Sequence, residues 1–327
     1  MKTYNVLLYY CYTRIENVDQ FRHEHHLLCL SLNLSGRIIV ATEGLNGTVS
    51  GLVADCAKYM ETVKADSRFA NIDFKIETCD KPTFTKLHVR VKSEIVHADL
   101  PHIDPNVKTG IHLSPTDFKA LKDNTDVVLL DVRSNYEHNL GKFKNAVTLD
   151  IDNFREFPEK VNELEEYKDK KIVTYCTGGI KCEKASAFLL EKGFENVYQL
   201  YGGIIKYGLE TDGEDFEGKC YVFDNRIAVD VNKKNPTVAS VCYLCGTPSA
   251  RMVNCANPEC NGHVAMCEQC GWQMDGACSP ACKAHPAKRP YDGTGYYQKK
   301  TNGYNPYASV GKATVKKDDV SHADPTQ

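Results

Sequence analysis

Eight cysteines between residues 242 and 282 constrain the fold of this chain more than any other feature of its sequence. They form four pairs, and two to four residues separate the members of each pair. Thiolates at this spacing can share one tetrahedral metal ion, and eight ligands are enough for two complete sites. We therefore predict two structural zinc ions bound by Cys242, Cys245, Cys255, Cys260, Cys267, Cys270, Cys278 and Cys282.

The spacing leaves the identity of the metal and the pairing of the cysteines open. An iron–sulfur cluster could also use four cysteines and would supply electrons, but the regular short pairs suit zinc better. His263 and His285 are alternative ligands that could replace a cysteine. The other cysteines among the 15 are scattered along the chain, which favours metal binding in a reducing compartment over a disulfide framework.

The chain has no run of about 18 apolar residues and no signal-peptide pattern at its start. We therefore expect a soluble, cytoplasmic protein without a membrane partner. Its 327 residues are enough for two or three packed domains. A formal net charge of -3 excludes a uniformly basic surface, so any polyanionic partner must be bound by local patches.

The first 98 residues follow the order β-α-β-β-α-β, which is typical of a ferredoxin-like (acylphosphatase-like) domain of the α+β class. Asn46-Gly47 is a strong turn signal, so we place the turn between the two central strands at residues 43–47. The expected elements are a strand at 4–12, a helix at 15–34, two strands within 36–51, a helix at 53–66, and strands near 72–77 and 86–92.

After a Pro-rich linker at residues 99–106, residues 112–215 alternate between strand-like and helix-like segments. Such alternation predicts a doubly wound parallel sheet of the α/β class. The expected strands lie at 127–133, 171–175 and 197–200, and the expected helices at 154–166 and 183–192. Residues 216–285 form the cysteine-rich region, which begins with a strand pair in 219–231. Residues 286–327 are expected to be a flexible tail rich in basic residues and Tyr.

Cys176 stands directly after a predicted strand and before a predicted helix, where parallel α/β sheets place their ligands. The loop that follows it, Thr177, Gly178, Gly179 and Ile180, allows backbone N–H groups to surround an anion, and Lys181 adds a positive charge. We therefore expect a reactive thiolate at Cys176 rather than an inert buried cysteine. Cys182 either reacts with an oxidised or persulfidated Cys176 or only packs in the helix.

A second set of residues suggests where a nucleic acid binds. Alternation in the strand at 86–92 places four basic or titratable side chains on one face, namely Lys86, His88, Arg90 and Lys92. This face is either an ordinary solvated surface or part of an RNA-binding sheet. Basic residues interleaved with tyrosines in the tail, such as Lys299 and Lys300, suit phosphate contact and base stacking but are equally typical of a solvated segment.

Asp131-Val132-Arg133, Tyr136-Glu137 and the loop opening with Cys176 resemble the single-domain rhodanese pattern, in which that cysteine carries a persulfide. The runs at 36–49, 176–186 and 218–226 are similar to the rhodanese-containing tRNA uridine hydroxylases. This resemblance extends over most of the chain. It implies a rhodanese-like central domain and oxygen-dependent conversion of the wobble uridine of tRNA to 5-hydroxyuridine.

The loop departs from the pattern at two points: Lys181 stands where an arginine is expected, and the second arginine that would favour thiosulfate is missing. Lysine keeps the charge and loses the planar fork that holds an oxyanion. We expect Asp131, Arg133 and Glu137 to form an internal ion pair that shapes the loop region.

The chemistry that fits these residues is addition of the Cys176 thiolate to C6 of uracil, which makes C5 nucleophilic enough to accept oxygen. A persulfide or sulfenate at Cys176 is the rival form. Dioxygen is the expected co-substrate, and the reductant is not identified by any motif. Two other functions stay open: a persulfide-carrying sulfurtransferase, and a non-catalytic module that binds RNA or protein.

Overall fold

The computed structural model describes residues 3–295 and residue 297. Its N-terminal domain is a five-stranded sheet in the order β4-β1-β3-β2-β5, and all neighbouring strands are antiparallel except β2 and β5. The first four strands have the predicted ferredoxin-like arrangement, and β5 extends the sheet at one edge. The elements are β1 (Tyr4–Tyr12), α1 (Val18–Ser31), β2 (Ser35–Ala41), β3 (Gly44–Leu52), α2 (Val53–Ala65), a short 3-10 helix (Ser67–Phe69), β4 (Lys75–Cys79) and β5 (Leu87–Val91).

The turn between β2 and β3 lies earlier than predicted. Ala41 pairs with Gly44, so Thr42 and Glu43 form the turn, whereas Asn46 and Gly47 lie inside β3. Gly47 is required there for space, since a Cβ atom at this position would lie 2.3 Å from the hydroxyl oxygen of Tyr9. The Asn-Gly signal therefore marks close packing against a ring, not a turn.

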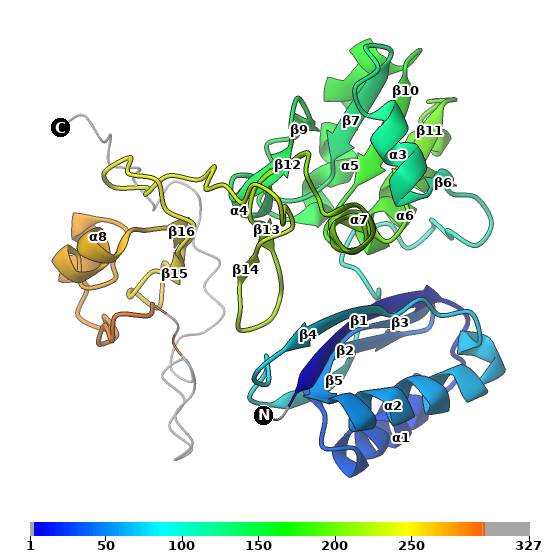
Figure 1. The fold of residues 1–327 in the computed structure, drawn as a ribbon, viewed down its shortest axis with the longest axis horizontal. Helices are drawn as coiled ribbons and strands as arrows, with labels where there is room; N and C mark the ends of the chain where they lie inside the picture. The colour runs from blue at the N-terminus through cyan, green and yellow to red at the C-terminus, as the bar shows by residue number, and fades with distance from the viewer. Residues whose placement is uncertain (1–2, 296, 298–327) are drawn as a thin grey trace.

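The two faces of this sheet have different partners. Leu7 and Tyr9 of β1 point into the core beneath α1 and α2. Leu8, on the opposite face, packs into the core of the central domain, and Figure 1 shows that α1 and α2 lie on the side of the sheet away from that domain.

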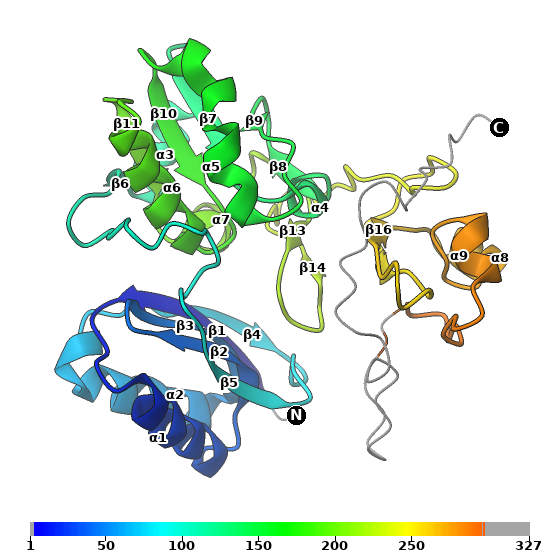
Figure 2. The ribbon, with the colours of Figure 1, turned by 180° about the vertical axis from the view of Figure 1, so that it is seen from behind.

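The central domain contains a five-stranded sheet in the order β6-β11-β10-β7-β9 in which all strands are parallel. Core residues from α5 and α6 cover one face, and core residues from α3 and α7 cover the other (Figure 2). The predicted doubly wound sheet is thus confirmed. The elements are β6 (Ile111–Leu113), α3 (Pro115–Leu121), β7 (Val127–Asp131), α4 (Asn135–His138), β8 (Gly141–Phe143), β9 (Val147–Thr148), α5 (Phe157–Lys160), β10 (Lys171–Tyr175), α6 (Ile180–Glu191), β11 (Val197–Leu200) and α7 (Gly203–Thr211).

The helix predicted at 154–166 is divided into three short pieces. The 3-10 turns Phe154–Glu156 and Val161–Tyr167 flank α5. Pro158 explains the first break, because it has no N–H to donate to the carbonyl four residues earlier.

The cysteine-rich region begins with β12 (Phe216–Gly218), which pairs with β8 of the central domain, and the predicted strand pair is the hairpin of β13 (Cys220–Tyr221) and β14 (Ala228–Val229). It continues with β15 (Met252–Asn254), β16 (His263–Ala265), α8 (Glu268–Gln273) and α9 (Pro280–Ala284). No helix among the described residues has both the length and the apolar character needed to cross a bilayer.

The first residues of the predicted flexible tail are packed. Arg289 is buried, and its guanidinium donates to the carbonyl oxygen of Ala256 at 3.1 Å and to Oδ1 of Asn261 at 2.9 Å. The expectation of a flexible tail from residue 286 is therefore wrong at Arg289. This residue is held because it donates hydrogen bonds to backbone carbonyls beside the cysteines. Residues 296 and 298–327, including Lys299 and Lys300, lie outside the described residues.

Candidate active site and metal centres

Cys176 lies in the short loop between β10 and α6, at the carboxyl edge of the central sheet. Gly179 has a φ of 100°, a left-handed conformation that glycine adopts most easily. This conformation directs its N–H toward the thiol, and the distance from N to Sγ of Cys176 is 3.2 Å. The N–H of Lys181 also hydrogen-bonds to Cys176.

The surroundings of Cys176 favour its thiolate form. Burial alone would raise the pKa of Cys176, but the Cys182 thiol, the charge of Lys181 and the two backbone N–H groups lower it to about 7. Burial and the neighbouring Cys176 together raise the pKa of Cys182 well above its ordinary value. In this pair Cys182 is therefore the hydrogen-bond donor and Cys176 holds the negative charge.

Lys181 is held by an acid instead of standing free for a substrate anion. Its ammonium group forms an ion pair with the buried carboxylate of Glu137, which also accepts from the N–H of Ser134 at 3.1 Å. Arg133 pairs with Asp131 through two hydrogen bonds of 2.6 and 2.8 Å. The expected three-residue ion pair is thus divided in two, since Glu137 is the partner of Lys181 and offers Arg133 only its backbone carbonyl at 3.5 Å.

The open face of the N-terminal sheet covers the cysteine loop. A Cβ atom on Gly178 would lie 2.8 Å from Cδ2 of Leu8, and the hydroxyl of Tyr12 donates to the carbonyl of Ile180 at 3.5 Å. As a result only 1% of Cys176 is exposed. The thiol lies at an interface between two domains that are far apart in sequence.

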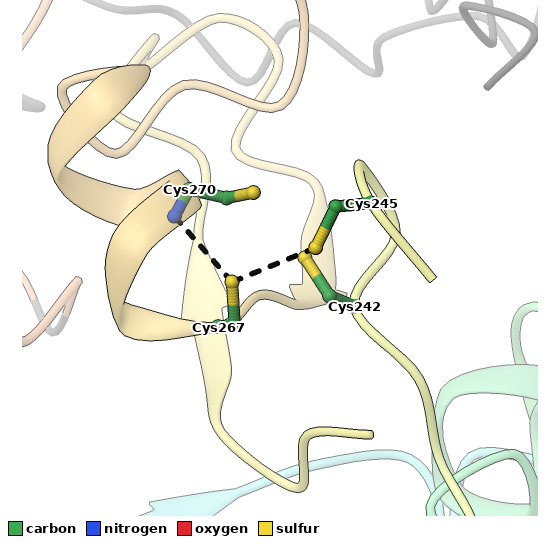
Figure 3. A group of neighbouring side chains, drawn as sticks. All are labelled: Cys242, Cys245, Cys267 and Cys270. Carbon is green, nitrogen blue, oxygen red and sulfur yellow. Dashed lines mark hydrogen bonds between the residues drawn. The ribbon is translucent and has the colours of Figure 1, made fainter. Parts of the chain in front are cut away.

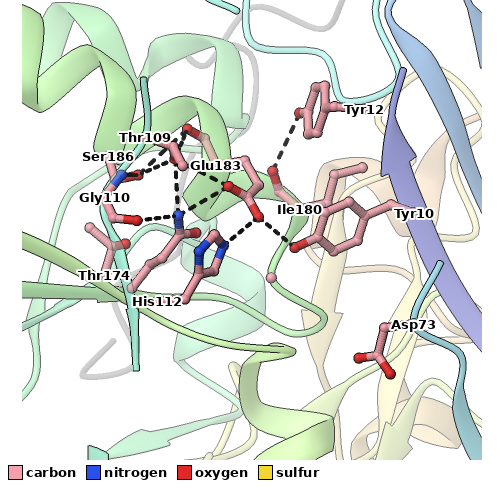
Figure 4. A network of polar contacts seen from close by, with 12 residues as sticks. Tyr10, Tyr12, Asp73, Thr109, Gly110, His112, Thr174, Ile180, Glu183 and Ser186 are labelled. Atoms are coloured by element: carbon pink, nitrogen blue, oxygen red, sulfur yellow. Dashed lines mark hydrogen bonds and ion pairs between the residues drawn. The ribbon is translucent and has the colours of Figure 1, made fainter. Parts of the chain in front are cut away.

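Glu183 is a second feature of this interface, and the sequence reasoning missed it (Figure 4). Its buried carboxylate accepts from Tyr10 at 2.9 Å, from His112 at 2.9 Å and from Gln199 at 3.0 Å. Burial would raise the pKa of Glu183, but these hydrogen bonds and the charge of His112 lower it. The sequence did offer one signal for this site: an acidic residue directly follows Cys182 in a predicted helix that is otherwise largely apolar.

The eight cysteines converge into two groups of four, and within each group all sulfur atoms lie within 4.8 Å of one another. Figure 3 shows the first group, which consists of Cys242, Cys245, Cys267 and Cys270. The second consists of Cys255, Cys260, Cys278 and Cys282. The first and third pairs along the chain thus share one site, and the second and fourth share the other.

The sulfur spacing fits a single tetrahedral ion. Zinc–sulfur bonds of about 2.3 Å imply about 3.8 Å between thiolates. The observed sulfur–sulfur distances are 3.7 Å for Cys245 and Cys267, and 3.6 Å for Cys260 and Cys278. Sulfur atoms this close leave no room for several iron atoms between them. Neither histidine considered above belongs to a group, since both groups consist of cysteines alone. His263 instead contacts Asn254, and His285 contacts Glu259.

The predicted basic face lies on β5, at the edge of the N-terminal sheet. Lys86, His88, Arg90 and Lys92 are exposed, and the alternate residues Leu87 and Val89 pack beneath α1 and α2. The basic face therefore belongs to the same side of the sheet as Leu8. Arg37 of β2 pairs with His88 in register and carries the basic surface one strand inward.

Three family models match the chain. They are the UPF0176 acylphosphatase like domain at residues 4–95, the rhodanese-like domain at 114–210 and the rhodanase C-terminal model at 217–283. Among solved structures, a rhodanese-related protein of Thermoplasma volcanium is 28% identical and aligns over 31% of this chain and 93% of its own, with a TM-score of 0.27.

Similar proteins align over far more of the sequence. A protein of Cytophaga hutchinsonii named tRNA uridine(34) hydroxylase is 66% identical over 310 residues, which are 95% of this chain and 99% of that protein. A protein of Enterococcus faecalis with the same name is 50% identical over 75% of this chain and 79% of its own length. The resemblance inferred from the motifs is confirmed, and this chain belongs to the tRNA uridine(34) hydroxylase family.

Proposed function

We propose that this protein hydroxylates C5 of the wobble uridine of tRNA, with Cys176 as the reactive thiolate. The observation that supports this role above all is the local environment of Cys176, whose pKa is lowered to about 7 although the thiol is buried. A thiolate available near neutral pH is the form that attacks an electrophilic carbon.

In this reaction the sulfur of Cys176 adds to C6 of uracil, and the electron pair of the C5–C6 double bond moves to make an enolate. C5 then accepts one oxygen atom derived from dioxygen. Two electrons and two protons from an external reductant convert the other oxygen atom to water. Loss of the C5 proton expels the thiolate and restores the double bond, so the enzyme returns to its initial state.

Entry of a base requires a change at the domain interface. Leu8 and Tyr10 lie over the loop, and Cys176 has almost no exposed surface. The N-terminal sheet must therefore move away from the loop before C6 of a uracil can reach the sulfur. Figure 4 shows the Tyr10–Glu183 and Tyr12–Ile180 contacts that this movement breaks.

We further propose that the two cysteine groups bind zinc and that β5 contributes to tRNA binding. Four thiolates close each metal site, which suits a structural ion and leaves no open position for substrate. The exposed basic residues of β5 lie on the sheet side that also covers Cys176, which favours phosphate contacts near the reacting base. A tRNA substrate and 15 cysteines that form no disulfide both favour a cytoplasmic location.

The first test is nucleoside mass spectrometry of tRNA from cells that lack this protein and receive either the wild type or Cys176→Ser, grown with and without oxygen. We expect 5-hydroxyuridine and its derivatives only with the wild type in air. Equal levels with both proteins would overturn the role of Cys176, and formation without oxygen would overturn the oxygen-dependent reaction.

A second test separates direct attack from a persulfide or sulfenate. An anticodon stem-loop with 5-fluorouridine at the wobble position should form a covalent adduct on the peptide that contains Cys176, because fluorine at C5 cannot leave as a proton does. Turnover of the normal substrate without any adduct from the fluorinated one would exclude addition to C6. Release of thiocyanate from thiosulfate and cyanide would instead indicate a sulfurtransferase.

A further inference from the structure

Phe223 is an aromatic side chain that the reaction described above does not use. It lies in the hairpin connection between β13 and β14, and 44% of it is exposed. Exposure of so much aromatic surface is unfavourable in water. The ring is nevertheless placed beside the cysteine loop and not in a core.

The hairpin is attached to the cysteine loop by its backbone. The hydroxyl of Thr177, the residue after Cys176, donates to the carbonyl of Tyr221 at 3.3 Å. The ring of Tyr221 meets that of Phe223 edge-on, with centroids 5.1 Å apart. On the loop side, Nζ of Lys181 lies 5.9 Å from the centroid of the Phe223 ring. Phe223 is thus in contact range of the cation that lowers the pKa of Cys176.

The same hairpin is attached to the N-terminal domain. Arg37 of β2 donates to the carbonyl of Phe223 at 3.4 Å, and the N–H of Asn225 donates to the carbonyl of Thr83 at 2.9 Å. Arg226 bridges Asp224, at 2.7 Å, and Glu77 of β4, at 3.1 Å. These contacts fix the backbone on both sides of the ring, so the exposed ring is held in place with little freedom.

Phe223 therefore stands where the basic sheet surface meets the cysteine loop. Arg37 belongs to that surface, since it pairs in register with His88 of β5. An exposed ring beside cations is the arrangement by which proteins hold single-stranded nucleotides: the base stacks on the ring and the phosphate contacts the cation.

We propose that Phe223 is a stacking platform for one unpaired base of the RNA substrate, beside the entrance to Cys176, and that Arg37 contacts a phosphate of the same strand. This inference rests on the proposed function for the identity of the RNA. It assigns a base-positioning role to a segment that lies outside the cysteine loop and outside the predicted basic strand.

The binding test compares three substitutions of Phe223 with one control substitution in the full-length, metal-loaded protein. Binding of an anticodon stem-loop with an unmodified wobble uridine is measured by fluorescence anisotropy for Phe223→Ala, Phe223→Leu, Phe223→Tyr and the control Leu27→Ala. Leu27 is similarly exposed but lies on α1, the layer away from the sheet surface. We expect about tenfold weaker binding, ~1.4 kcal/mol, for Ala and Leu, and unchanged binding for Tyr and for the control.

The Leu variant separates stacking from packing. Leu restores apolar volume without an aromatic face, so wild-type affinity in Phe223→Leu would show that the ring only fills space and would overturn the inference. Wild-type affinity in Phe223→Ala, or no measurable binding by the wild type, would overturn it as well. Cys176→Ser is included because it should bind RNA normally yet form no 5-hydroxyuridine in cells. If it still forms the product, the catalytic role proposed for Cys176 fails, while the binding data test the role of Phe223 independently.

Discussion

Cys176 and Cys182 are two buried, hydrogen-bonded thiols whose pKa values are shifted in opposite directions. Burial acts on both thiols in the same direction. Only Cys176 also has the Gly179 and Lys181 N–H groups and the charge of Lys181 to offset it. The negative charge therefore settles on one sulfur, and the second sulfur stabilises it as a proton donor.

This assignment gives a prediction for Cys182→Ala. Loss of the donor should raise the pKa of Cys176 from about 7 by roughly one unit, so that the thiolate fraction at pH 7 falls severalfold. The rate of Cys176 alkylation, followed by peptide mass spectrometry as a function of pH, measures the midpoint. Cys29→Ala, which removes a buried thiol from the N-terminal core, is the control. An unchanged midpoint in Cys182→Ala would show that Lys181 and the backbone suffice.

At the scale of elements, α6 connects the cysteine loop to the N-terminal domain. Successive residues of a helix point about 100° apart, so three neighbours can meet three different partners. The Cys182 thiol hydrogen-bonds to Cys176, and the Glu183 carboxylate accepts a hydrogen bond from Tyr10 of β1. Lys184 forms ion pairs with Glu43 at 2.8 Å and Glu94 at 2.7 Å. One helical turn thus determines both the charge of the thiol and the contact with the sheet that covers it.

Lys184→Met should therefore be strongly destabilising. Lys184 is fully buried, and its loss leaves the carboxylates of Glu43 and Glu94 close together without a counter-ion. We expect a loss of roughly 3–5 kcal/mol in the free energy of unfolding, measured by urea denaturation. Lys192→Met, in an exposed pair at the end of the same helix, should change stability by less than about 0.5 kcal/mol. Equal effects of the two substitutions would contradict this account of the interface.

At the scale of the whole molecule, the cysteine-rich region has only small apolar clusters, and most of the buried residues in them are cysteines. We therefore expect metal binding to supply much of its folding free energy. Besides the pairing of β12 with β8, His263 contacts the central domain, because its ring lies 5.7 Å from that of Tyr136.

Metal removal should consequently unfold this region alone. We expect two zinc ions per chain by elemental analysis, and a chelator should abolish the hydrogen-exchange protection of residues 242–295. The sheets of the N-terminal and central domains should keep theirs, because their cores contain neither cysteine group. Loss of protection throughout the chain would show that the metal sites support the other domains.

The sequence was informative where the signal is local. The cysteine loop, the cluster of eight cysteines and the alternation of the central domain depend on neighbours in the chain, and the structure contains all three. Other features depend on residues far apart in sequence and were not predicted. They are the interleaved pairing of the cysteines, the packing of β1 over Cys176 and the Tyr10–Glu183 hydrogen bond. The turn prediction at Gly47 was wrong for the same reason. A glycine is needed there because the ring of Tyr9, on another strand, leaves no space for a side chain.

The interleaving of the two cysteine groups has a consequence for synthesis of the chain. A nascent polypeptide can complete neither ligand set until residue 270 has left the ribosome, and the other set waits for residue 282. During that interval the earlier thiolates have no closed site. A single proteolytic cut between Cys260 and Cys267 would likewise divide both sets at once, so one break in this stretch separates the halves of both groups.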